Sequence, residues 1–237
     1  MESTAVWPVR WWLVLIAGVA TTVIVAAGVI VADRDGPSDP AVASQARQAM
    51  SALARVAVVG ERAPRSDYQR EAFGTAWTDA VTVAGGANGC DTRNDVLTRD
   101  LVDVQLSVID SCPRAVMSGE FRSPYTGEFV VFRRDRRAGA VQIDHIVPLA
   151  YAWDMGAWAW PWAARANFAN DTANLVAVDA ASNLAKSDHE PARWLPPNRT
   201  FHCQYAIQFI AVTVSYRLQV DSPSVDTLAA VLRRCGG

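Results

Sequence analysis

The longest uncharged segment of the chain constrains its organisation most, because it separates a short terminus from everything that follows. Residues 11–32 include no charged side chain. As a helix, at ~1.5 Å per residue, they would reach about 33 Å and could cross a hydrocarbon core about 30 Å thick. Trp7, Trp11 and Trp12 lie at the start of the segment, where indole rings favour the headgroup region. The sequence therefore predicts an N-terminal hydrophobic helix that inserts into a membrane.

The charges beside this segment predict its orientation. Arg10 and the free amino group precede it, and Asp33-Arg34-Asp35 follows it. By the positive-inside rule, residues 1–10 form a cytoplasmic stub and the rest of the chain lies outside. Two alternatives stay open: a cleaved signal peptide, although its apolar region is usually only ~7–15 residues long, and a buried core helix. The anchor and the signal peptide both predict export, either as a membrane-anchored or as a secreted protein.

The chain contains four cysteines, and this number is consistent with an exported protein. An even number of cysteines in an exported chain predicts disulfide bonds, and four cysteines permit three connectivities. Pairing of near neighbours would close two loops of modest length, each stabilising the fold by about 3 kcal/mol in the chain-entropy model. Zinc binding is the alternative, but the sequence contains neither a CxxC nor an HxxxH spacing. The predicted pairs are Cys90–Cys112 and Cys203–Cys235.

The part after the hydrophobic segment reads as a linker followed by one domain. Residues 33–41 are rich in Pro, Asp and Gly and predict the linker. In the whole chain of 237 residues, 51% are hydrophobic and the net charge is −2, which excludes a disordered chain and a generally basic nucleic-acid coat. The pattern of residues 42–237 predicts an α+β domain. The stretch from 94 begins as a helix and becomes extended by 109. The other expected helices are 42–58, 148–155, 160–168, 180–186, 201–216 and 224–234, and the expected strands are 129–132, 140–143 and 175–178.

Polar residues at three places on these expected elements are candidates for a catalytic site. Asp144-His145 ends one strand, Asn174 precedes the next strand, and Asn183 lies on the short helix that follows. This strand–strand–helix arrangement resembles the ββα-metal (HNH) nuclease motif. The match includes the proline three residues after the histidine and the Asn-x-x-Lys-x-Asp pattern from Asn183. The resemblance implies an HNH core embedded in a mostly helical domain.

The motif uses residue types that suit phosphodiester hydrolysis. This reaction needs a deprotonated water, a cation on the phosphate oxygens and a stabilised leaving oxygen. A histidine can act as a neutral base, and carboxylate and amide oxygens suit Mg²⁺ or another divalent ion such as Mn²⁺. The resemblance implies that His145 is the general base and that Asn174 braces the loop that orients it. It also implies that Asp144 and Asn183 hold the metal.

A closer resemblance covers roughly residues 50–235. Its segments are similar to exported actinobacterial HNH proteins, which are related to the C-terminal nuclease domain of GmrSD modification-dependent restriction enzymes. The chain departs from them at His189-Glu190, where Lys-Asp is common, and a glutamate near the phosphate path would weaken DNA binding. It also has additional tryptophans, Trp158 and Trp162. The resembling segments are Arg62-Ala63-Pro64, Tyr68-x-Arg70, Phe73-Gly74, Trp77, Cys90 to Asp95, Pro124 to Gly127 and Pro191 to Pro197.

The basic residues near the motif predict contacts with DNA through its phosphates. Candidates for this role are Lys186, as a point charge, Arg70 and Arg93, and the basic run Arg133, Arg134, Arg136 and Arg137. Solvated side chains, or structural ion pairs for Arg70 and Arg93, are the alternatives. The sequence contains no helix-turn-helix or zinc finger, so specificity should be low, and no dedicated protein partner is evident. We thus expect a metal-dependent endonuclease that acts on DNA outside the cytoplasm; the alternative is a non-catalytic cell-surface protein on an HNH scaffold.

Overall fold

The computed structural model describes residues 39–135 and 138–236. The predicted stub, the hydrophobic segment 11–32 and most of the predicted linker lie outside these residues. Among the described helices, none has the length and apolar character needed to span a membrane. The first described helix begins at Pro40, so the last two residues of the predicted linker are helical, and the carboxylate of Asp39 accepts a hydrogen bond from the Ala41 amide.

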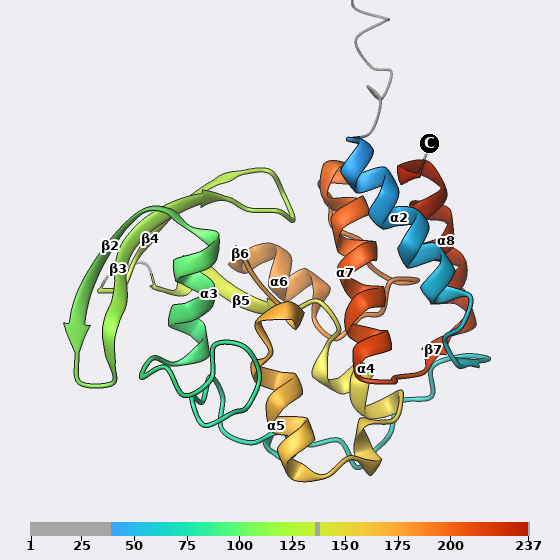
Figure 1. Cartoon of the computed structure of the whole chain (residues 1–237), viewed down its shortest axis with the longest axis horizontal. Coiled ribbons are helices and arrows are strands. Elements are labelled where there is room, and N and C mark those ends of the chain that lie inside the picture. The colour runs from blue at the N-terminus through green and yellow to red at the C-terminus, as the bar shows by residue number, and fades with distance from the viewer. Residues whose placement is uncertain (1–38, 136–137, 237) are drawn as a thin grey trace, which may run out of the picture. The chain divides into compact units, whose positions relative to one another are not determined.

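Three helices form one layer of the fold: α2 (Pro40–Leu53), α7 (His202–Ser215) and α8 (Ser222–Cys235). Figure 1 shows them stacked side by side. The alanines at 43, 46 and 49 are buried together with Leu53, and this small-residue face lets the two C-terminal helices approach closely. Helix α2 ends five residues before the predicted boundary at 58, because Val58–Val59 instead forms strand β1, which pairs in parallel with β7 (Val220–Asp221).

A three-stranded antiparallel sheet and helix α3 (Thr92–Asp100) form a second region. The strands are β2 (Val102–Ile109), β3 (Cys112–Arg122) and β4 (Phe129–Arg133), with β3 in the centre. The change from helix to strand after residue 94 and the strand at 129 were predicted correctly, whereas β3 was not expected. A second hydrophobic core lies between this sheet, α3 and the next two strands, formed by residues such as Val96, Leu97, Phe132, Ile143 and Leu175.

The strand–strand–helix unit that the sequence predicted occupies the centre of the fold. Strand β5 (Val141–His145) pairs antiparallel with β6 (Leu175–Asp179), and α6 (Ala180–Lys186) follows directly. Asp179 terminates the strand and caps the helix by accepting a hydrogen bond from the Ser182 amide. Helices α4 (Leu149–Asp154) and α5 (Trp162–Asn170) fill the connection between the strands. Short 3₁₀ turns complete the chain: η1 (Arg70–Phe73), η2 (Ala138–Ala140), η3 (Ala157–Ala159), η4 (Thr172–Asn174) and η5 (Arg199–Phe201).

Both predicted disulfides are present, and this excludes the zinc alternative for these cysteines. Cys90–Cys112 joins the segment before α3 to the start of β3, and Cys203–Cys235 joins the start of α7 to the end of α8. The described residues contain no free cysteine. Each bond therefore links two elements that also pack against each other.

We expect the C-terminal disulfide to stabilise the helical layer. Because it closes a loop with a sequence separation of 32 residues, the Cys203→Ser/Cys235→Ser variant should lose about 3–4 kcal/mol of unfolding free energy in the chain-entropy model. Urea unfolding of the two proteins measures this difference, and peptide mapping of the oxidised wild type serves as the control. Equal midpoints, or crossed cysteine pairs in the map, would contradict the prediction.

Candidate functional site

Asp144 lies near the end of β5 with its carboxylate held through one oxygen. Its Oδ2 accepts a hydrogen bond from the Tyr125 hydroxyl at 2.5 Å and forms an ion pair with the Lys186 ammonium at 2.8 Å. Burial, and then the charge of Asp144, raise the pKa of Tyr125, so the phenol stays protonated and donates. The other oxygen, Oδ1, accepts no hydrogen bond from the described residues. The carboxylate is therefore fixed in orientation while one oxygen remains available.

Lys186 is the cation of this arrangement, and it is fully buried. Its ammonium also donates to the backbone carbonyl of His145 at 2.8 Å. Helix α6 thus contacts β5 through both the side chain of Asp144 and the backbone of the next residue. This differs from the predicted phosphate contact, because the Lys186 ammonium has no exposed surface with which it could meet a substrate.

His145 ends β5 and is enclosed by two neighbours. Its Nε2 lies 2.9 Å from the Ala169 carbonyl oxygen, and its ring stacks on the Trp77 indole with 5.8 Å between centroids. A carbonyl oxygen can only accept a hydrogen bond, so Nε2 carries the proton and Nδ1 is the nitrogen with a free lone pair. Burial lowers the pKa of His145 to about 4, and the hydrogen bond to Ala169 and the charge of Asp144 oppose this only in part. The imidazole is accordingly neutral at pH 7.

Asn174 fixes the chain directly after the histidine. Its side-chain oxygen accepts a hydrogen bond from the Val147 amide at 2.8 Å, and its amide nitrogen donates to the Val147 carbonyl at 3.2 Å. Its own backbone carbonyl accepts from the Ile146 amide. Because Asn174 is fully buried and holds the two residues that follow His145, it lies where a residue that braces this loop would lie.

Asn183 lies on α6, one turn before Lys186, and faces β5. Its amide nitrogen donates to the Gln142 side chain at 2.6 Å, which leaves its carbonyl oxygen without a described partner. Gln142 and Asp144 alternate along β5, so their side chains share one face of the strand. The available oxygens of Asp144 and Asn183 are hard donors of the type that Mg²⁺ prefers, and this donor set fits such an ion. In the described part of the chain, no three His, Cys, Asp or Glu side chains are grouped to hold a metal.

The predicted DNA-binding arginines lie apart from this group. Arg93 donates to the carbonyls of Ala138 and Val141, so it holds the start of β5, about 13 Å along the strand from His145. Arg134 donates to the side chain of Asn94 and to a backbone carbonyl of β3. Both therefore make structural contacts, in contrast to the predicted phosphate contacts. Arg133 is exposed at the end of β4, and Arg136 and Arg137 of the same basic run lie outside the described residues.

Glu190 is not free to repel a phosphate. It is buried and accepts a hydrogen bond from Arg62 at 3.0 Å. The same guanidinium pairs with Asp154 and Asp188 at 2.8 and 2.7 Å, and lies over the Tyr151 ring. One arginine thus bridges Asp154, Asp188 and Glu190, and the carboxylate of Glu190 is turned to this arginine in the interior.

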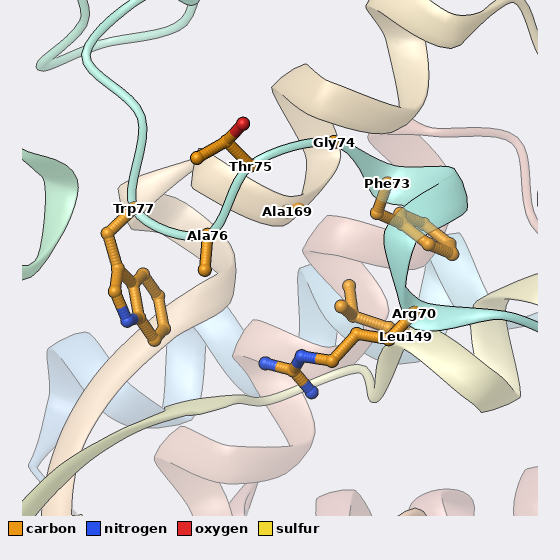
Figure 2. Close-up of a pocket in the computed structure, with 8 residues that line it drawn as sticks. All are labelled: Arg70, Phe73, Gly74, Thr75, Ala76, Trp77, Leu149 and Ala169. Atoms are coloured by element: carbon orange, nitrogen blue, oxygen red, sulfur yellow. The ribbon is translucent and has the colours of Figure 1, made fainter.

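A pocket opens beside His145. It is lined by both residues that enclose the imidazole, Trp77 and Ala169, and by the 3₁₀ turn η1 with the loop that follows it. Figure 2 shows the Gly74 to Trp77 loop crossing above it, with the Arg70 side chain extending below that loop toward the Trp77 indole. The complete lining comprises Arg70, Phe73, Gly74, Thr75, Ala76, Trp77, Leu149 and Ala169.

Sequence reasoning did not assign several of these contacts. Tyr125 entered the sequence analysis only through a resembling segment, with no contact to Asp144. Gln142 was seen as a strand residue, Trp77 had no link to the histidine, and the Ala169 contact is made by the backbone. Tyr125 and Asp144 are 19 residues apart in the chain, and no sequence pattern of that spacing predicts a contact between two residues.

Comparisons with known proteins place the chain among related sequences. The model of one protein family, described as GmrSD restriction endonucleases, C-terminal domain, matches residues 91–231, which include Asp144, His145, Asn174, Asn183 and Lys186 but not Arg70 or Trp77 of the pocket. An uncharacterized secreted protein of Arthroderma benhamiae is 37% identical over 195 residues, which cover 81% of this chain and 86% of that protein. No solved structure matches the chain significantly.

The buried ion pair makes a testable prediction about stability. Lys186→Met leaves the Asp144 charge buried without its cation, so the free energy of unfolding should fall by about 3–5 kcal/mol. Adding Asp144→Asn to this variant removes the uncompensated charge and should restore part of the loss. Urea unfolding measures both changes.

Arg55→Met is the matched control, because it also removes a cation and Arg55 is exposed. It should change stability by no more than about 0.5 kcal/mol. A Lys186→Met protein as stable as the wild type, or a double variant no more stable than Lys186→Met alone, would contradict the role of the pair.

Proposed function

Since the chain belongs to the family of GmrSD restriction endonuclease C-terminal domains, we propose that it is a metal-dependent HNH endonuclease that hydrolyses phosphodiester bonds in DNA. The single observation that carries this proposal is the neutral imidazole beside a fixed carboxylate at the end of β5. His145 keeps a free Nδ1 and Asp144 keeps a free Oδ1, and the two residues that contact the imidazole, Trp77 and Ala169, line a pocket.

His145 acts as the general base in this proposal. Its neutral Nδ1 accepts the proton of the attacking water, and the Nε2–H that bonds the Ala169 carbonyl stabilises the imidazolium that results. The negative charge of Asp144 stabilises the same cation. Trp77 stacks on the ring and, with Ala169, fixes its plane, so little reorganisation is needed before proton transfer. Asn174 maintains the backbone that follows the base.

Asp144 and Asn183 would hold the divalent ion, Mg²⁺ or Mn²⁺. When bound, such an ion supplies positive charge at the phosphate oxygens and stabilises the leaving oxygen. Contacts to the remaining polar atoms orient both ligands. Tyr125 and Lys186 bind one oxygen of Asp144, and Gln142 accepts a hydrogen bond from the amide nitrogen of Asn183. Each ligand therefore offers an oxygen in a defined orientation.

The substrate and its compartment follow from the surroundings of the site. The described residues contain no helix-turn-helix or zinc-finger module, so we propose that DNA is bound through its phosphates and with low sequence specificity. The two disulfides, and the secreted relative in Arthroderma benhamiae, support activity outside the cytoplasm. Whether the exported protein is anchored through residues 11–32 or released is decided by amino-terminal sequencing of the fractionated protein.

Metal dependence is the first test of this function. The exported part should nick supercoiled plasmid DNA in Mg²⁺ or Mn²⁺ and should stop in excess EDTA, because Asp144 and Asn183 provide hard oxygen ligands. Gel electrophoresis of the plasmid measures the conversion. Cleavage that continues undiminished in EDTA would overturn the metal role, and a complete lack of cleavage would favour the non-catalytic scaffold.

Replacing the base is the second test. His145→Ala should lower the cleavage rate by at least about 10²-fold, the scale expected for loss of a general base. His202→Ala is the matched control, because that imidazole bonds the Pro196 carbonyl away from the site and its loss should leave the rate near wild type. Circular dichroism verifies that both variants are folded. Normal cleavage by His145→Ala would show that another group is the base.

A further inference from the structure

The basic side chains around His145 differ in what they already bind. Lys186 is buried on Asp144, Arg62 pairs with three carboxylates, and Arg165 donates to the Ala72 and Trp160 carbonyls. Arg93 and Arg134 hold backbone and side-chain acceptors near the other end of β5. A guanidinium that donates to buried protein acceptors is not available to a phosphate. Most of the cations that the sequence predicted as phosphate contacts therefore bind acceptors within the protein.

Arg70 is different. It is exposed, and it makes no hydrogen bond or ion pair with another described side chain. It lines the pocket beside Trp77 and Ala169, the two residues that contact the imidazole, and its guanidinium extends across the pocket toward the indole (Figure 2). The positive charge of Arg70 is close enough to disfavour protonation of His145. An unpaired guanidinium therefore lies in the same pocket as the two residues that contact the candidate base.

No acidic side chain competes for this guanidinium inside the pocket. The other seven lining residues are uncharged. The nearby carboxylates of Asp154 and Asp188 both bind Arg62, and Glu71, the next residue in the chain, forms no ion pair with Arg70 in the structure. The pocket therefore offers a positive charge and hydrogen-bond donors without an internal counter-ion, which suits an anionic ligand.

The pocket wall is also fixed in shape. Gly74 has φ of +85°, and a Cβ at this position would lie 3.2 Å from the Trp162 ring, so the turn after η1 requires glycine. At the other end of the loop, Trp77 accepts a hydrogen bond from the Thr92 amide and stacks on His145. A ligand that enters here would meet a preformed loop and need order only the Arg70 side chain.

We propose that Arg70 binds a backbone phosphate of the nucleic-acid strand in the pocket between η1 and Trp77, next to the bond that is cleaved. The planar guanidinium can donate two parallel hydrogen bonds to one phosphate, which a lysine cannot do. This inference rests on the proposed nuclease function and replaces Lys186, Arg93 and Arg134 as the principal phosphate contact. It assigns to Arg70 the phosphate contact that the sequence left open between this residue and several others.

The test measures binding separately from cleavage. The full chain and its Arg70→Gln variant bind a fluorescein-labelled DNA oligonucleotide in EDTA, and anisotropy gives Kd over a series of salt concentrations. Arg70→Gln should weaken binding about tenfold at low salt, and the slope of log Kd against log salt should fall by about 0.7–0.9, the change for one phosphate contact. Arg55→Gln, an exposed arginine on the helical layer, is the matched control and should change neither quantity appreciably.

A second variant separates charge from geometry. Arg70→Lys keeps the positive charge, so it should retain most of the salt slope, but it loses the paired hydrogen bonds and should raise KM for plasmid cleavage. Arg70→Gln should melt at the wild-type temperature, because Arg70 supports no other described side chain. A lowered melting temperature in Arg70→Gln would instead indicate a structural role and would overturn the proposal.

The outcomes distinguish this inference from the function on which it rests. Cleavage by the wild type together with unchanged Kd, salt slope and KM in Arg70→Gln would overturn the phosphate site and leave the nuclease standing. Binding that depends on Arg70 without any cleavage by the wild type would support the site and overturn the nuclease. A wild type that neither binds nor cleaves DNA would overturn both.

Discussion

The ion pair between Lys186 and Asp144 is the contact on which the arrangement of the site depends. It joins the last residue of α6 to the end of β5 in a place where the ammonium has no exposure to water. The same ammonium binds the His145 carbonyl, and the same carboxylate binds Tyr125 from the segment before β4. One buried charge pair therefore sets the positions of three separate segments relative to the histidine.

A buried ion pair is costly to form, and an apolar pair of similar volume would often stabilise a fold as well or better. The ion pair is better explained by the orientation that it gives to the Asp144 carboxylate than by a contribution to the stability of the fold. A carboxylate with two donors on Oδ2 cannot rotate freely, and its Oδ1 consequently keeps one direction. If Asp144 is a metal ligand, the cost of burying Lys186 is offset by a ligand that needs no rearrangement when the ion binds.

The sequence predicted the central unit well because its signals are local. Helix α6 was predicted with its observed bounds, 180–186, since Asp179 caps the helix, and the short apolar strands on either side of the motif were found within a few residues. Strand β3 was missed, because its sequence includes Pro113 and Gly119 and lacks a regular alternation, and its pairing partners supply the order that its own residues do not. Long-range contacts such as Tyr125 to Asp144 were likewise beyond reach.

The sequence could not indicate which cations keep their donors free, for a related reason. Charge in a sequence does not reveal which acceptors the fold will bring to it, so a basic run such as Arg133-Arg134 and a motif lysine looked equally available to DNA. In the structure, Lys186, Arg93 and Arg134 are satisfied by protein oxygens, and satisfied donors add little to the attraction of a phosphate. The sequence left Arg70 open between a phosphate ligand and a structural ion-pair partner, and in the structure it is the side chain whose charge remains unpaired beside the residues that enclose the base. The availability of a cation, and not its place in a motif, therefore decides where a substrate phosphate is bound.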